Sequence, residues 1–214
     1  MSSPARIQPG NILEWARKVQ AIAQNGLAFT QDPFDKERFE QLQQIVTQIL
    51  TAELQITPGH IQSLWQGDEG YATPKVDVRG AVFEGDKVLM VRERSDGKWT
   101  LPGGWVDVGD GPAFACEREI REESGYLAKA VKLAAVFDRS NPKHGHPPSI
   151  LHIYKLMFIC ELTGGTATLS NETDGVEFFP VSNLPPLSSG RASQSQIERM
   201  YEHHLNRGLP TDFD

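Results

Sequence analysis

The sequence predicts an α+β fold, in which a mixed sheet lies between helices and is preceded by a small all-helical domain. Residues 11–65 carry apolar side chains at helical spacing. Two strand-like runs then flank the turn Glu84-Gly85-Asp86, and a helix, further strands and a closing helix follow. This order of elements is typical of a sheet with helices packed on it. We expect a helical domain at 1–70 and an α+β domain at 71–214.

Three amphipathic helices are expected in the first domain. The first begins at Asn11 and ends at Asn25-Gly26, with Ile22 on its apolar face. The second follows Pro33 and has Ile45 on its apolar face, and the third runs from Pro58 to Trp65. Because such helices bury little surface alone, we expect them to pack on the second domain or on another subunit. The polar, Gly/Pro-marked residues 66–74 are the expected linker.

The second domain is expected to alternate strands with the segments that carry function. A short strand at 98–102 leads to Gly103-Gly104, and further strands are expected at 128–140, 150–162 and 176–181. A polar loop at 141–149 separates two of them. Residues 191–206 have the periodicity of a closing helix.

Composition restricts the class of protein. The chain has 214 residues with 39% hydrophobic and 23% charged side chains, which is ordinary for a globular protein. A net charge of −7 argues against binding duplex nucleic acid through broad phosphate neutralisation. The sequence has no apolar run of about 18 residues, so we expect no membrane span. It also has no apolar signal core, so we do not expect secretion. We therefore expect a cytoplasmic protein whose Cys116 and Cys160 are free thiols.

The segment from Leu101 to Tyr126 holds the densest chemistry. A helix is expected from Pro112 to Gly125, because proline suits a first helical position and glycine suits the residue after a helix end. Glu119, Glu122 and Glu123 then share one narrow sector of the helix. Carboxylates this close repel unless a cation lies among them, and oxygen ligands favour Mg²⁺ or Mn²⁺. If the helix is considered alone, its glutamates could instead form an acidic face that is simply exposed to solvent.

The flanks of this helix resemble the signature of the Nudix hydrolase family, which has a glycine, a glutamate, Arg-Glu, Glu-Glu and a glycine at fixed spacings. The positions that match are Gly104, Arg118, Glu119, Ile120, Glu122, Glu123, Gly125 and Tyr126. Asp110 stands where the family usually has glutamate, which puts efficiency in doubt more than reaction type. The resemblance implies an α/β/α sandwich. It also implies that Glu119, Glu122, Glu123 and the backbone carbonyl of Gly103 hold the metal, and that Arg118 holds a carboxylate through a bidentate pair.

Other candidate residues lie outside the signature. In parts of the family a distal loop supplies a further acidic ligand or base, which here would be Glu172, with Glu177 as the rival. Arg79 could reach a substrate phosphate or sit in an ion pair. Trp105 could stack on a base or pack under its loop. His146 lies in the 141–149 loop, which could select the leaving group, or it is simply solvated.

The resemblance implies metal-dependent hydrolysis of a pyrophosphate bond in a nucleoside diphosphate linked to another moiety. A subgroup with a helical N-terminal segment includes bacterial CDP-choline and ADP-ribose pyrophosphatases, so these two substrates are favoured. The alternatives are an enzyme that processes RNA ends and a non-catalytic ligand sensor. The net negative charge counts against an enzyme that binds RNA. The presence of all three signature glutamates counts against a non-catalytic sensor. The N-terminal helices are expected to build a homodimer.

Overall fold

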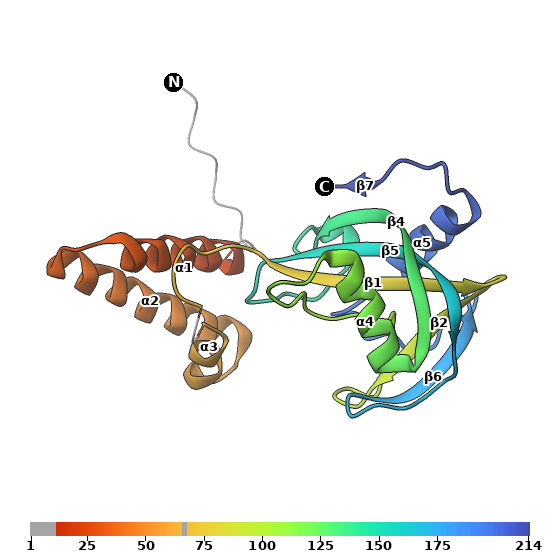
Figure 1. Cartoon of the computed structure of the whole chain (residues 1–214). Helices are drawn as coiled ribbons and strands as arrows, with labels where there is room; N and C mark the ends of the chain where they lie inside the picture. The colour runs from red at the N-terminus through yellow and green to blue at the C-terminus, as the bar shows by residue number, and fades with distance from the viewer. Residues whose placement is uncertain (1–11, 66–67) are drawn as a thin grey trace, which may run out of the picture. The chain divides into compact units, whose positions relative to one another are not determined.

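The computed structural model describes residues 12–65 and 68–214 (Figure 1). The chain divides into two compact units. One is the N-terminal part up to Pro74 together with Pro148–His152, and the other comprises Lys75–Pro147 and Ile153–Asp214. The expected helix start at Asn11 and the linker residues 66–67 lie outside the described residues. No helix in the described part of the chain is long and apolar enough to cross a membrane.

The first unit contains the three helices that the sequence predicts. They are α1 (Ile12–Phe29), α2 (Pro33–Leu54) and α3 (Pro58–Trp65). Asp32 caps α2, because its carboxylate accepts hydrogen bonds from the backbone N–H of Phe34 at 2.7 Å and of Asp35 at 3.1 Å. The core of this unit is formed by Ala16, Val46, Leu50, Ile61 and Ile150.

The predicted end of α1 at Asn25-Gly26 is wrong, because the helix continues to Phe29. A Cβ atom at Gly26 would overlap the ring of Phe39 on α2. The glycine therefore serves the close approach of two helices and does not end the first one. The side chain of Asn25 is also used differently, since its oxygen accepts a hydrogen bond from the N–H of Ala72.

Part of the predicted apolar face of this unit is not buried. Ile22 is 59% exposed and Ile45 is 50% exposed, although both fall on the expected buried stripes. Phe29 and Phe34, which lie near the turn between α1 and α2, are also exposed. The small core of the unit is filled by other residues, so these large apolar side chains lie on its surface.

The second unit is built on one mixed sheet. Its strands are β1 (Lys75–Glu84), β2 (Lys87–Glu93), β3 (Trp99–Thr100), β4 (Tyr126–Asp138), β5 (Ile153–Gly165), β6 (Thr173–Pro180) and β7 (Asp212–Phe213). The order across the sheet is β3-β2-β1-β5-β4-β7, and β6 pairs with β2. β1 runs parallel to β5 and antiparallel to β2. The mixed sheet is confirmed, whereas β7 was not predicted because two residues carry no periodicity.

Two helices cover the two faces of this sheet (Figure 1). On one face, α4 (Pro112–Ser124) packs Cys116 and Ile120 against Val78 and Val82. The opposite face packs against α5 (Gln194–Leu205), whose Ile197 and Met200 join the other core cluster. Because successive side chains of a strand point to opposite faces, β1 contributes to both clusters. The predicted α/β/α arrangement is confirmed.

α4 begins and ends where the sequence predicts. Pro112 is its first residue, and Gly125 closes it in the left-handed region with φ of 75°. Ala115, Cys116 and Ile120 are buried on the side of the helix that faces the sheet, whereas Ala113 is exposed. Glu123 is buried together with Ile120, so the core-facing side of the helix carries a carboxylate.

Gly80 sets the distance between β1 and α4. A Cβ atom at this position would lie 2.5 Å from Cδ1 of Ile120 and 3.0 Å from Sγ of Cys116. Gly80→Ala should lower the free energy of unfolding by about 1–3 kcal/mol, the usual scale of overpacking, and lower the melting temperature by several degrees. Gly59→Ala is the control, since no atom lies within 4 Å of a Cβ there. An equal melting temperature for both variants would contradict this account of the packing.

Candidate active site

The site begins with the backbone of Pro102–Gly104, which runs beside β1. The N–H of Val78 donates to the Gly104 carbonyl and the N–H of Gly80 donates to the Pro102 carbonyl, both at 2.9 Å. Gly103 has φ of +146°, and a Cβ there would overlap the carbonyl oxygen of Val78. Only glycine fits this position without strain. Among the described residues, the carbonyl oxygen of Gly103 accepts no hydrogen bond, so it is available as a ligand.

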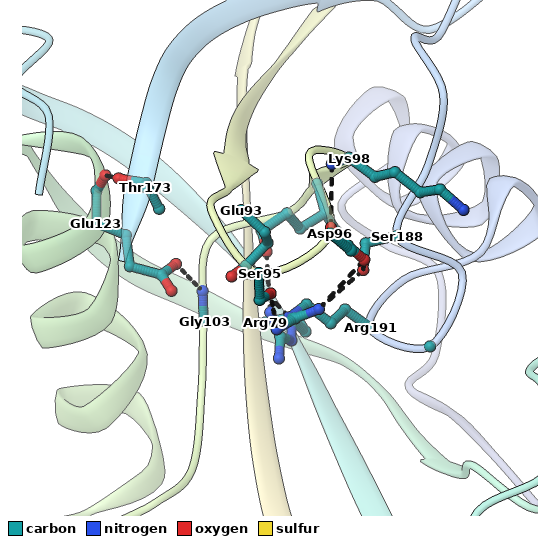
Figure 2. A network of polar contacts seen from close by, with 12 residues as sticks. Arg79, Glu93, Ser95, Asp96, Lys98, Gly103, Glu123, Thr173, Ser188 and Arg191 are labelled. Carbon is teal, nitrogen blue, oxygen red and sulfur yellow. Dashed lines mark hydrogen bonds and ion pairs between the residues drawn. The ribbon is translucent and has the colours of Figure 1, made fainter. Parts of the chain in front are cut away.

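The three signature carboxylates of α4 lie in different environments. Glu123 is buried and accepts a hydrogen bond at 2.8 Å from the N–H of Gly103 (Figure 2). The side chain of Glu119 is largely buried, and that of Glu122 is half exposed. The helix and the glycine loop are therefore joined directly through Glu123.

Arg118 is the hub of the neighbouring acidic residues. Its guanidinium lies 2.8 Å from Glu119, 3.1 Å from Glu122, and 3.2 Å from both Asp107 and Asp110. The predicted bidentate pair with a single carboxylate is thus replaced by contacts to several. Asp110 reaches Arg118 despite being one methylene shorter than the glutamate usual at this position. Asp110 therefore joins the loop before α4 to the helix through its contact with Arg118.

Burial shapes the protonation of these carboxylates. It raises the pKa of Glu123 to about 8, although Arg79 and the Gly103 N–H act in the opposite direction. Burial also raises the pKa of Glu119, against the influence of Arg118. Carboxylates buried with too little positive charge, beside a free carbonyl oxygen, have the donor chemistry that suits a hard divalent cation. No three His, Cys, Asp or Glu side chains of the described residues already form a metal-holding group, so phosphate and water would complete the coordination.

A buried layer of charge lies along β1 and β5. Arg79 is 4% exposed, and its Nε and Nη2 donate to the two oxygens of Asp77 at 3.0 and 2.7 Å. Its Nη1 donates to the Leu101 carbonyl, and Lys155 donates to Asp77 at 2.7 Å. Burial opposes the charge of Asp77, yet Arg79 and Lys155 lower its pKa overall. Of the two roles considered for Arg79, the structure shows the ion pair.

Sequence reasoning missed Glu93 and Arg191. Glu93, the last residue of β2, is 5% exposed, and its Oε1 lies 2.9 Å from Nε of Arg191 (Figure 2). Burial raises the pKa of Glu93, while Arg191 and Arg79 act to lower it. Neither residue belongs to a spacing pattern, because the segments that bear them are far apart in the chain. Only the pairing of the β2–β3 turn with the loop before α5 brings them together.

Comparison with known proteins agrees with this geometry. Residues 73–200 match the family model of the NUDIX domain. The chain belongs to the Nudix family. Residues 11–65 match a second model, described as a UDP-X-like N-terminal oligomerisation domain. The chain is therefore a Nudix hydrolase, as its signature helix indicates.

Similar proteins extend over most of the chain. YjhB of Bacillus subtilis, whose name assigns it provisionally to the ADP-ribose pyrophosphatases, is 42% identical over 94% of this chain and 96% of its own length. A solved UDP-X diphosphatase is 30% identical, with a TM-score of 0.62 over 97% of this chain and 100% of that one. An ADP-ribose pyrophosphatase from Streptococcus suis is 35% identical, with a TM-score of 0.60 over 66% of this chain and 100% of that one.

The remaining predicted Nudix site residues lie outside α4. Glu172 is exposed in the turn before β6, where its carbonyl accepts a hydrogen bond from Arg94, and its charge acts on Glu93. Glu177 is exposed on β6, opposite Met90 of β2. Trp105 follows the glycines and is 49% exposed, which leaves it able to stack on a ligand. The roles of Glu172 and Trp105 stay predictions.

His146 is held by the loop before α5. Its Nδ1 lies 2.6 Å from the Ser189 carbonyl, so Nδ1 carries the hydrogen. Its Nε2 is buried without a hydrogen-bond partner among the described residues. Burial lowers the pKa of His146 to about 4, so the ring is neutral at pH 7. A substrate contact for this residue stays a prediction.

The depressed pKa of His146 predicts a pH dependence of stability. The folded protein holds this proton less tightly than the unfolded chain, whose value is near 6.5. The contribution to stability is therefore full above pH 6.5 and is lost as the pH falls towards 4. His146→Asn keeps a donor for Ser189 but cannot titrate. Between pH 7 and 4.5 the melting temperature should fall further for the native protein than for this variant. Parallel curves would contradict the assignment.

Proposed function

We propose that the protein hydrolyses the pyrophosphate bond of a nucleoside diphosphate linked to another moiety, with ADP-ribose as the first candidate substrate. The observation that carries the proposal is the joining of Glu123 to Gly103 beside Glu119. This arrangement offers carboxylate oxygens and a free carbonyl at one place. Diphosphates bind through divalent cations held by such oxygens.

The donor set supports Mg²⁺ or Mn²⁺ as the cofactor. Glu119, Glu122, Glu123 and the Gly103 carbonyl would hold it. When bound, the cation would lower the pKa of a water molecule and withdraw charge from phosphate oxygens. Arg118 orients Glu119 and Glu122 through its contacts at 2.8 and 3.1 Å. The raised pKa of Glu123 suits a group that accepts a proton near neutral pH when it is not bound to metal.

The relatives support ADP-ribose and also suggest a second class of substrate. Two relatives are named as ADP-ribose pyrophosphatases outright, and YjhB provisionally so. The structure matched over nearly the whole chain is named as a UDP-X diphosphatase, which supports UDP-linked compounds. CDP-choline, favoured by the sequence resemblance, stays a candidate. A nucleotide-derived substrate also supports a place in the cytoplasm.

A panel assay tests this proposal. With Mg²⁺ or Mn²⁺, we expect turnover of ADP-ribose, a UDP-sugar or CDP-choline into two monophosphates, and none of a capped RNA 5′ end. Glu123→Gln should lower kcat by about 100-fold or more, the scale reported for losing one charge-stabilising group. Glu117→Gln is the matched control, since Glu117 lies on the same helix but pairs with Lys129.

The outcomes of this assay separate the alternatives. Turnover of the RNA end alone would favour an RNA-processing enzyme. A folded protein that binds these nucleotides without cleaving any of them would favour a ligand sensor. Equal loss of activity in both variants would show that the effect of Glu123→Gln is structural.

We further propose that the helical unit assembles the protein into a homodimer. Its exposed apolar residues, Ile22, Phe29, Phe34 and Ile45, are the kind of surface that a partner covers. The match of residues 11–65 to an oligomerisation domain supports the same role. Burying several such side chains would supply the hydrophobic free energy that the small unit lacks alone.

Light scattering tests the dimer. The native protein should have twice the mass of one chain, and the double variant Ile22→Glu/Ile45→Glu should shift towards one chain. Leu169→Glu is the control, because Leu169 is an exposed apolar residue of the other unit. A native protein of single-chain mass at all concentrations would refute the dimer.

A further inference from the structure

A buried carboxylate outside the signature lies next to the catalytic loop. Glu93 ends β2 and is 5% exposed, yet its carboxylate is held only by the ion pair with Arg191 at 2.9 Å. Among the described residues, no hydrogen bond reaches its second oxygen, Oε2. The described buried side-chain atoms that lack a partner do not include this oxygen, so Oε2 reaches solvent while the rest of the side chain is buried.

Asp77 shows how this protein satisfies a purely structural buried carboxylate. Both of its oxygens accept hydrogen bonds from Arg79, and Lys155 adds a third. Asp77 and Glu93 have similar burial, at 5% each, and both feel the charge of Arg79. The hydrogen bonds of Arg79 and Lys155 go to Asp77 and the Leu101 carbonyl, and none goes to Glu93. Glu93 keeps an oxygen free where Asp77 does not.

Arg191 is fixed in place by a dedicated set of contacts. Its Nη1 donates to Ser188 at 2.9 Å and its Nη2 donates to Ser95 at 3.2 Å, while Ser188 donates to Asp96 at 2.7 Å. The backbone joins the same two segments, since the N–H of Ser188 donates to the Trp99 carbonyl at 2.8 Å. Together these contacts join the loop before α5 to the β2–β3 turn, and Figure 2 shows the side chains of Arg191, Ser188, Ser95 and Asp96 gathered there. This set of contacts is called the clasp below.

The clasp places Glu93 on the side of Gly103 that faces away from α4. In Figure 2, Gly103 lies between Glu123 on one side and Arg79 and Glu93 on the other. The charge of Glu93 acts to raise the pKa of Glu123, and the charge of Arg79 acts to lower the pKa of both. Glu93 and Glu123 thus lie on the two sides of Gly103 in this view and come from two elements, β2 and α4. Each has one oxygen committed, to Arg191 or to the Gly103 N–H.

We propose that Glu93 is a further cation-facing carboxylate of the active site and that Arg191 is its positioning residue. The inference rests on the proposed function, because it concerns the cation that would bind there. It extends the ligand set beyond α4 to β2, on the opposite side of the glycine loop. The loop before α5 acts through Arg191, which holds one oxygen of Glu93 and leaves the other for the cation. Arg191 itself touches no reacting atom.

A structural role for Glu93 is the competing explanation. In that case Glu93 would serve only to anchor Arg191, and its replacement would lower stability without changing cation affinity. The clasp already has other anchors for Arg191 in Ser95 and Ser188. The two explanations differ in one measurable quantity, the affinity for Mn²⁺.

The experiment measures Mn²⁺ affinity by electron paramagnetic resonance of the free ion. The full-length protein is titrated in the presence of α,β-methylene ADP-ribose, which is not hydrolysed. Glu93→Gln should raise the Mn²⁺ Kd about tenfold or more, and Arg191→Met should raise it by a similar or smaller factor, the scale seen for partners of metal ligands. Arg191→Lys, which keeps the charge, should restore part of the affinity. Glu117→Gln should bind as the native protein does.

Each outcome is decisive. Native Mn²⁺ affinity in Glu93→Gln, with or without a lower melting temperature, would overturn the inference and leave Glu93 structural. Native affinity in Arg191→Met together with a weakened Glu93→Gln would keep the ligand and remove the positioning role. Failure of the native protein to bind Mn²⁺ with this analogue and with the corresponding analogues of a UDP-sugar and CDP-choline would refute the proposed function, and the inference with it.

Discussion

The close approach of the Pro102–Gly104 backbone to β1 is the constraint on which the site depends. Gly103 has no space for a side chain, and its N–H holds Glu123 of α4. Gly80, on the same stretch of β1, lets α4 approach from its own side, because any side chain there would meet Ile120. Two glycines therefore fix the helix, the loop and the strand to one another. The charged groups take their positions from this backbone packing, because the repulsion between closely packed atoms rises steeply as they approach.

Charge is then distributed unequally over this scaffold. Asp77, Arg79 and Lys155 satisfy one another, which allows their burial despite the cost of desolvation. Glu123 and Glu93 are buried with fewer partners, and burial raises the pKa of both. Buried charges are thus fully paired around Asp77, whereas those of Glu93 and Glu123 are only partly paired. Such partly paired buried charges are expected where a protein binds a ligand.

Much of this could be predicted from the sequence because it depends on local spacing. Pro112 and Gly125 bound α4, and the spacing of its glutamates places them together with Arg118. What could not be predicted depends on tertiary packing. Gly26 resembles a helix end but is explained by the ring of Phe39, and Ile22 fits a buried stripe but lies outside a small core. Glu93 and Arg191 meet only through the contacts of two loops, which no periodicity encodes.

Arg79 explains how unsatisfied carboxylates can coexist on both sides of Gly103. Its charge acts on Glu93 and Glu123, and so lowers the cost of keeping both in a buried place. Its Nε, Nη1 and Nη2, however, already donate to Asp77 and the Leu101 carbonyl. Arg79 therefore cannot move onto either glutamate without breaking contacts in the layer beneath. A permanent cation that is hydrogen-bonded to other groups supports the two carboxylates without neutralising them, and their free oxygens keep their affinity for a second, exchangeable cation.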